Sequence, residues 1–268
     1  MSNSSIGIFD SGVGGLTVFR EVSCLMPGVK IIYLGDTARV PYGSKSPETV
    51  TKFSIQGLRF LESRDVELIV VACNTVSALS LDTLQRKMSL PLVGVLKPGA
   101  EKALSLTRRG IIGVIGTEAT IMSRAYLKVI KQMDSKVKVL SRSCPLLVPL
   151  IEEGWLDGEV TRKVIWHYLK PLMRKRIDTL ILGCTHYPMV KRVIQELTGD
   201  KIKLVDSARE VALKVKENAG NPSVISCSSS FNPEAEFFVT DRPRKFSQIG
   251  KMFLGYNING KVRKIILE

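Results

Sequence analysis

VELIVVACNT at residues 66–75 and IDTLILGCTH at residues 177–186 are the two stretches that decide the fold of this chain. Each contains an acidic residue, an apolar run, a small residue, a cysteine and two polar residues in the same order. A continuous apolar run of this kind indicates a strand buried in a parallel sheet. Cys73 and Cys184 would then lie at the carboxyl ends of two strands, where open α/β sheets bind their ligands. Two cysteines facing each other across one cleft would suit a reaction that needs a proton-transfer group on each face of a carbon atom.

The similarity extends beyond the two cysteine segments. Three further pairs of short apolar segments recur at offsets of 106, 108 and 111 residues, namely 7–11 with 113–117, 29–32 with 137–140, and 92–95 with 203–206. These outer pairs also fit a simpler explanation, because any α/β protein repeats apolar strands at similar spacing. The cysteine segments match beyond the strand, into the polar residues, and they indicate an internal repeat more strongly.

Apolar runs alternate with helix-like stretches from residue 6 to about residue 220, which predicts βα units and parallel sheets. The expected strands are 6–10, 30–34, 67–72, 92–96, 111–115, 137–141, 178–183 and 202–206. Ser46 as N-cap and Pro47 at the first helical position predict a helix over 47–64. After a loop at 220–230, we expect a strand at 237–240 and a last helix at 244–254.

We therefore expect an α/β fold of two pseudo-two-fold-related domains, with the active site in the cleft between them. Lys97-Pro98-Gly99 reads as a turn at the domain boundary. The C-terminal segment has no counterpart in the second half, so it is expected to complete the first domain. The predicted domains are residues 1–97 with 208–268, which carry Cys73, and residues 98–207, which carry Cys184.

Composition describes an ordinary globular protein rather than a membrane or secreted one. The 268 residues are 44% hydrophobic and 24% charged, and no apolar run approaches the roughly 20 residues of a membrane span. The N-terminus lacks the pattern of a signal peptide. Five dispersed cysteines do not form a disulfide framework, and two histidines without a CxxC argue against a zinc site. We expect free thiols, no metal and a cytoplasmic location.

The net charge of +14 admits a nucleic-acid or acidic-membrane partner. The basic residues are dispersed, however, and the densest groups, at 170–176 and 242–245, are not interleaved with aromatic residues. We interpret the charge as solvated helix faces whose field favours anionic substrates. Binding to nucleic acid or to a DNA-handling enzyme is expected at most as a side activity, and membrane binding is not expected.

Cys73 and Cys184 are the strongest candidates for chemistry, because each ends an apolar strand and is followed by hydrogen-bonding residues. Helices are expected to begin near Ser77 and Pro188, where amide groups stabilise a thiolate or bind a carboxylate. Cys24, Cys144 and Cys227 are interpreted as small apolar core residues. His186 is placed to tune a thiol, and Asp10, followed by glycines, is placed to meet an ammonium group.

Several motifs together resemble the bacterial glutamate racemases of the cofactor-independent aspartate/glutamate racemase superfamily. They are FDSGVGGLTV at 9–18, GDTARVPYG at 35–43, VACNT at 71–75, GVIGT at 113–117 with Thr120, LGCTHYP at 182–188 and FFVTD at 237–241. The resemblance spans essentially the whole chain. It implies two α/β domains related by a pseudo-two-fold axis, in agreement with the repeat.

By this resemblance, Cys73 and Cys184 are the two catalytic acid–base groups, one on each face of glutamate. Asp10 and His186 would assist the thiols, with Glu152 as a further member of that group. The positions that match substrate-binding residues are Asp10, Ser11, Pro41, Tyr42, Gly43, Asn74, Thr75, Thr117, Thr120, Thr185 and His186. The resemblance further implies that no cofactor is needed and that D-glutamate feeds peptidoglycan synthesis in a bacterium, with roles in cell-wall biogenesis and cell shape.

Two alternatives stay open. One is a racemase or epimerase for another amino acid, such as aspartate or diaminopimelate. The other is a non-catalytic protein that binds a partner through its basic surface. A homodimer is compatible with the sequence, although no residues specify its face.

Overall fold

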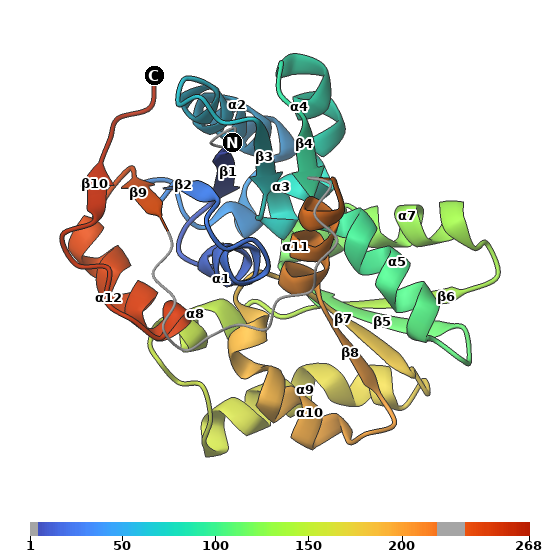
Figure 1. Ribbon diagram of the computed structural model, residues 1–268. Helices are drawn as coiled ribbons and strands as arrows, with labels where there is room; N and C mark the ends of the chain where they lie inside the picture. The colour runs from blue at the N-terminus through green and yellow to red at the C-terminus, as the bar shows by residue number, and fades with distance from the viewer. Residues whose placement is uncertain (1–4, 219–233) are drawn as a thin grey trace.

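The computed structural model describes residues 5–218 and 234–268, and within them two parallel sheets form the framework (Figure 1). In spatial order, the first sheet contains β10 (Val262–Lys264), β9 (Ala235–Val239), β2 (Lys30–Gly35), β1 (Ser5–Asp10), β3 (Leu68–Val71) and β4 (Leu92–Gly94). The second contains β6 (Lys138–Ser143), β5 (Ile111–Gly116), β7 (Thr179–Gly183) and β8 (Lys203–Asp206). Every described strand pair is parallel.

Helices connect and cover the strands. They are α1 (Leu16–Leu25), α2 (Pro47–Glu62), α3 (Asn74–Leu79), α4 (Leu81–Lys87), α5 (Leu96–Leu106), α6 (Glu118–Met122), α7 (Ala125–Met133), α8 (Leu147–Glu152), α9 (Glu159–Met173), α10 (Lys191–Thr198), α11 (Ser207–Asn218) and α12 (Pro243–Leu254), with 3-10 turns at Tyr42–Ser44 and Tyr187–Val190. Figure 1 shows α1 and α11 side by side in the middle of the molecule, and α11 contacts strands β4, β7 and β8, so it touches both sheets.

The internal repeat is confirmed by topology and register. The order β2-β1-β3-β4 of the first sheet recurs as β6-β5-β7-β8 in the second. Ile6 pairs with Ile31 and Leu68, and its counterpart Ile112 pairs with Val139 and Thr179. For the last strand, the predicted offset of 111 is wrong by one, because Ile69 faces Leu92 whereas Leu180 faces Leu204.

The C-terminal segment returns to the first sheet, where β9 pairs along β2 and β10 pairs with β9. The predicted strand at 237–240 and helix at 244–254 correspond to β9 and α12, while β10 was not predicted. The predicted loop at 220–230 lies outside the described residues. The helix expected at 47–64 is α2, whose N-cap Ser46 accepts a hydrogen bond from the Thr49 amide at 3.3 Å.

Some local expectations are wrong. Lys97-Pro98-Gly99 is not a turn but part of the first turns of α5. Proline fits there because the amides of a helix's first turn have no intrahelical partner to lose. The helix after Cys73 begins at Asn74 rather than near Ser77, and Cys73 itself is its N-cap residue. Pro188 lies in a 3-10 turn, and the following α-helix starts at Lys191.

The cysteines divide into two groups. Cys73, Cys144 and Cys184 are buried free thiols. Cys24 is half-buried and disulfide-bonded, so the expectation of a free core thiol is wrong at this position. Cys227 lies outside the described residues.

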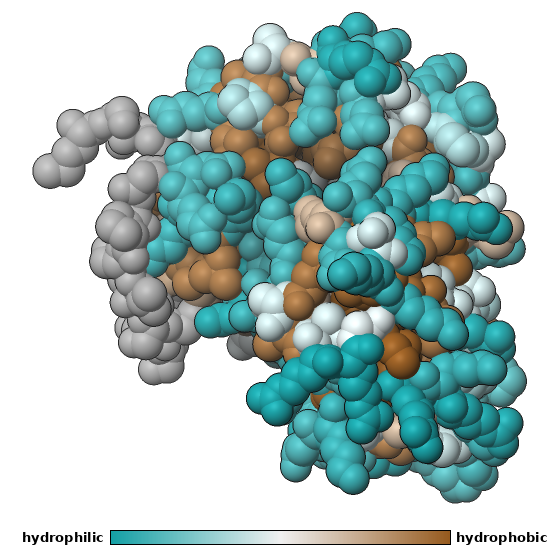
Figure 2. Space-filling view, turned by 90° about the vertical axis from the view of Figure 1, so that its right-hand side faces the viewer, coloured by the Kyte–Doolittle hydropathy of each residue, from teal (hydrophilic) through white to brown (hydrophobic). Residues whose placement is uncertain are grey.

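The surface agrees with the composition. Hydrophilic residues cover most of the face in Figure 2, and hydrophobic residues show mainly in its recesses. Across residues 5–218 and 234–268, none of the helices combines the length and apolar character that crossing a bilayer requires.

Candidate active site

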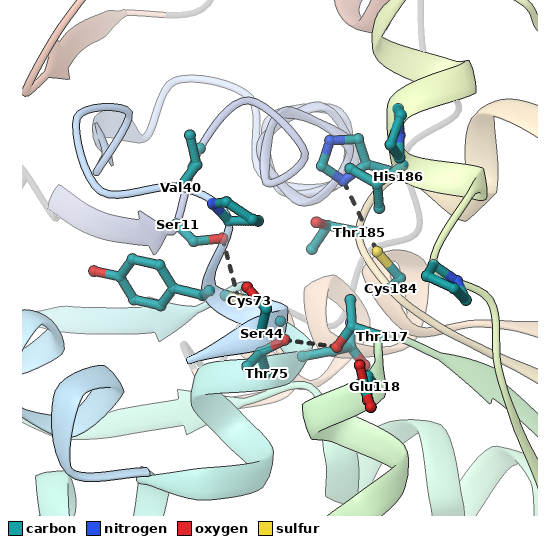
Figure 3. A pocket seen from close by; sticks show the side chains of 18 of the residues that line it. Ser11, Val40, Ser44, Cys73, Thr75, Thr117, Glu118, Cys184, Thr185 and His186 are labelled. Atoms are coloured by element: carbon teal, nitrogen blue, oxygen red, sulfur yellow. Dashed lines mark hydrogen bonds between the residues drawn. The ribbon is translucent and has the colours of Figure 1, made fainter. Parts of the chain in front are cut away.

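A cavity of about 430 Å³ lies where strands of both sheets end. Ser11 follows β1, Cys73 and Asn74 follow β3, Thr117 follows β5, and Cys184 follows β7. Figure 3 looks into this cavity, with Ser11 and Cys73 on one side and His186 and Cys184 on the other. The equivalent strands of the two sheets therefore present their cysteines to one space, as the repeat predicted.

Cys73 is held in a buried, weakly polar environment on the wall made by the first sheet. Its Sγ lies 3.4 Å from Oγ of Ser11, and its side chain is 5% exposed. Burial raises the pKa of Cys73 to about 12, and the nearby Asp10 carboxyl adds to this, while the Ser11 hydroxyl and the Val76 amide oppose it. At neutral pH this thiol keeps its proton, which makes it a proton donor.

Cys184 has a different neighbour. Its Sγ lies 3.8 Å from Nδ1 of His186, and Nε2 of His186 lies 3.0 Å from Oε1 of Glu152. Burial opposes the charged form of the imidazole, but its contacts with Cys184 and Glu152 outweigh burial and raise the pKa of His186 to about 10. Burial likewise opposes the charge of Glu152, whose pKa is nevertheless lowered by His186. Cys184 therefore lies next to an imidazolium whose charge is supported by Glu152.

Asp10 lies behind the cavity wall rather than in it. It is fully buried, and its Oδ2 accepts a hydrogen bond from the Gly12 amide at 2.9 Å. Its Oδ1 has no hydrogen-bond partner within the described part of the chain. Burial raises the pKa of Asp10, and the Gly12 amide and His186 oppose that rise. A direct contact between Asp10 and a substrate ammonium group stays a prediction, while the Asp10 carboxyl interacts electrostatically with Cys73 and His186.

The predicted loop Pro41-Tyr42-Gly43 lines the cavity, held from behind by Asp36. Asp36 is fully buried and accepts hydrogen bonds from the Tyr42 hydroxyl, from Nε of Arg39 at 2.6 Å and from the Thr240 hydroxyl at 2.8 Å. The Tyr42 hydroxyl therefore donates its hydrogen bond to a carboxylate of the protein rather than into the cavity. Thr240 follows β9, so the C-terminal segment supports this wall of the cavity.

Three threonines join the two halves at the cavity floor. The Thr75 hydroxyl lies 2.9 Å from that of Thr117 and 3.4 Å from that of Thr120, and the last two lie 2.9 Å apart. Thr75 and Thr117 line the cavity, whereas Thr120 is buried behind them. Thr185 lines the cavity beside Cys184. Of the predicted site residues, only Asp10 and Thr120 are therefore missing from the cavity surface.

Part of the cavity wall is formed by residues that the sequence did not indicate. The additional lining residues are Gly12, Val40, Ser44, Glu118, Cys144, Pro145, Val148, Pro149 and Glu153. Most of them are adjacent in sequence to a predicted site residue, and this adjacency is the signal that could have indicated them. The stretch 144–153 follows β6, the counterpart of β2, and equivalence with the loop after β2 could have indicated it.

Comparison with known proteins gives consistent results. The model of the family described as Asp/Glu/Hydantoin racemase matches residues 17–215. A glutamate racemase of Geobacter metallireducens is 51% identical over 264 residues, which cover 98% of this chain and 97% of that protein. The crystal structure of a glutamate racemase from Bacillus anthracis superimposes with a TM-score of 0.91 at 38% identity, covering 99% of this chain and 98% of the other. A glutamate racemase from Francisella tularensis in complex with D-glutamate gives a TM-score of 0.88 at 37% identity, covering 100% and 99%.

Proposed function

This chain belongs to the Asp/Glu/Hydantoin racemase family, and we propose that it is a glutamate racemase that interconverts L- and D-glutamate through Cys73 and Cys184. The observation that carries the proposal is the placement of these two free thiols at the ends of equivalent strands, on the two sides of one cavity. The D-glutamate complex of the Francisella relative supports glutamate as the substrate.

The two thiols divide the proton transfers between them. In one direction, the Cys184 thiolate beside His186 removes the α-proton of the bound enantiomer. The electron pair of the broken C–H bond stays on the α-carbon. The Cys73 thiol gives its proton to the opposite face, which completes the inversion and leaves Cys184 as thiol and Cys73 as thiolate. The other enantiomer reacts in the reverse sense and restores the first form.

The protein must stabilise a carbanion next to a carboxylate. Hydroxyl groups of Ser11, Thr75, Thr117 and Thr185 surround the cavity, and the Asn74 amide also lines it. Such preorganised donors stabilise developing charge most strongly where water is excluded. Retention of the substrate's ammonium charge beside the carbanion lowers the barrier further.

The remaining site residues act through others. His186 contacts the Cys184 thiol, and Glu152 supports the charge of His186. Asp10 contributes a buried carboxyl group close to Cys73 and His186, and Thr120 orients Thr117 and Thr75. The loop Pro41-Tyr42-Gly43 closes the side of the substrate pocket.

We further propose two domains, residues 1–97 with 208–268 and residues 98–207. The first and second sheets fall on either side of this division. The product D-glutamate would supply peptidoglycan synthesis in the cytoplasm. A homodimer remains a prediction.

The test is circular dichroism of L-glutamate and, separately, of D-glutamate incubated with the purified protein without added cofactor. We expect loss of optical activity from both enantiomers. Cys73→Ala and Cys184→Ala should each abolish it, whereas Cys144→Ala, which removes a third thiol of the same cavity, should retain racemisation. No change with glutamate, followed by racemisation of aspartate or diaminopimelate, would contradict the substrate. Unchanged racemisation in either of the first two variants would contradict the two-thiol mechanism.

A further inference from the structure

Two residues that follow β5 in the chain, Tyr126 and Ser207, hydrogen-bond to the side chain of the residue after Cys73. Asn74 comes directly after Cys73 and is 2% exposed. Its Oδ1 accepts a hydrogen bond from the Tyr126 hydroxyl at 2.8 Å, and its Nδ2 donates to the Ser207 hydroxyl at 3.4 Å. Ser207 in turn donates to the Leu182 carbonyl at 3.1 Å. A continuous hydrogen-bond chain thus runs from the residue after Cys73 to the strand that ends before Cys184.

Tyr126 also contacts this second strand directly. Its ring lies so close to Gly183, the residue before Cys184, that a Cβ at Gly183 would lie 3.1 Å from Cε2 of Tyr126. The tyrosine itself is 2% exposed, and burial together with the nearby Cys184 raises its pKa, so its hydroxyl stays a neutral donor. Its helix α7 contacts α3, which begins at Asn74, and Figure 1 shows α3, α5, α7 and α11 gathered where the two sheets meet.

We propose that Tyr126 is a positioning residue that fixes the spacing of Cys73 and Cys184 across the cavity, a role that rests on the proposed two-thiol racemisation. The two thiols belong to different sheets, so their separation is set by whatever joins those sheets. Tyr126 contacts the neighbour of each thiol through one rigid ring and one hydroxyl. It is absent from the cavity lining, so it acts on the reaction only through Asn74 and Gly183.

This spacing matters because each thiol must reach the same α-carbon from opposite faces. Small displacements of reacting groups reduce rates steeply, by roughly 100-fold for about 1 Å. Without the Tyr126 hydroxyl, the Asn74 amide loses one of its two anchors and the link between the sheets loosens. The ring of a phenylalanine would still fill the space against Gly183.

The experiment is to assay the Tyr126→Phe variant with both enantiomers of glutamate. The temperature is chosen so that circular dichroism shows the variant to be fully folded. We expect kcat to fall about tenfold, the equivalent of one buried hydrogen bond lost, with KM little changed. Because the enantiomers have equal free energies in solution, kcat/KM must fall equally in the two directions. The primary isotope effect with α-deuterated glutamate should be at least as large as in the wild type, since proton transfer is the slowed step.

Tyr256→Phe is the matched control, because the Tyr256 hydroxyl is buried without a hydrogen-bond partner among residues 5–218 and 234–268. It should leave kcat unchanged. In an Asn74→Ala background, Tyr126→Phe should have no further effect on kcat, since the hydroxyl acts through Asn74. Wild-type kcat in Tyr126→Phe, or the same loss with and without Asn74, would overturn the inference. Failure of the wild type to racemise glutamate would instead refute the proposed function.

Discussion

Replacing His186 by asparagine tests the charge that we assign to the Cys184 side of the cavity. The imidazolium lies 3.8 Å from the Cys184 sulfur and is held charged by Glu152 at 3.0 Å. Asparagine is close in size and keeps a hydrogen-bond donor, but it carries no charge. The substitution therefore removes the electrostatic stabilisation of the thiolate and preserves most of the packing.

The magnitude follows from the geometry. Two unit charges at about 4 Å interact by about 4 kcal/mol at an effective dielectric constant of about 20. His186 is 7% exposed, so water screens the pair little. The amide dipole of asparagine recovers part of this energy, and we take about half, or about 2 kcal/mol, as lost. That loss corresponds to a decrease of kcat/KM by about 30-fold.

The assay is the circular dichroism of both glutamate enantiomers as a function of pH. The raised pKa of His186, about 10, means that the imidazolium is present at neutral pH and lost as pH rises through that value. The racemisation rate of the wild type should decrease as the pH rises through this value, and the rate of His186→Asn should show no such decrease. His167→Asn, which changes the only other histidine, exposed and outside the cavity, should behave as wild type. A kcat/KM within about twofold of wild type in His186→Asn would refute the assigned charge.

Two further predictions concern stability. A Cβ at Gly14 would lie 2.3 Å from Oγ1 of Thr185 and 2.4 Å from Nδ1 of His186. Gly14→Ala should therefore lower the free energy of unfolding in urea by about 1–3 kcal/mol and reduce kcat. Gly99→Ala in α5 should be tolerated, because the nearest atom to its added Cβ among the described residues is 3.7 Å away. Glu152→Gln should lower the melting temperature most between about pH 5 and 6.5. In this range the ion pair of Glu152 with His186 stabilises the fold fully, because the pH is above the ordinary pKa of a glutamate and below that of a histidine. The difference should shrink as pH falls through the lowered pKa of Glu152 and as it rises through about 10, and a pH-independent difference would contradict the ion pair.

The sequence predicts the parallel strands well because their burial on both faces imposes continuous apolar runs. The cysteine segments also revealed the repeat, since equivalent strands keep the same neighbours and register in both sheets. The Lys97-Pro98-Gly99 segment was misassigned because proline and glycine mark turns only statistically. In α5 the proline occupies the first turn, where its missing amide costs no hydrogen bond. The packing of the helix therefore determines the conformation of this segment.

The cavity residues next to strand-end motifs were predictable, but their partners were not. Asp36 could be noticed after β2, yet nothing local indicates that Thr240, 204 residues later, donates to its carboxylate. The position of Asp10 behind the wall likewise depends on how the first loop folds back on itself. Hydrogen bonds between distant segments, such as that of Tyr126 with Asn74, leave no periodicity in the sequence and require the assembled structure.

The central claim is that one thiol acts on each face of the α-carbon, and its most direct test is deuterium incorporation during racemisation in D₂O. Starting from protiated L-glutamate, and separately from D-glutamate, proton NMR would follow the α-position of substrate and product at early conversion. Two bases predict that the product carries deuterium while the recovered substrate remains protiated, in both directions. A product that retains the substrate's own α-proton, or a substrate that exchanges as fast as product forms, would contradict the account.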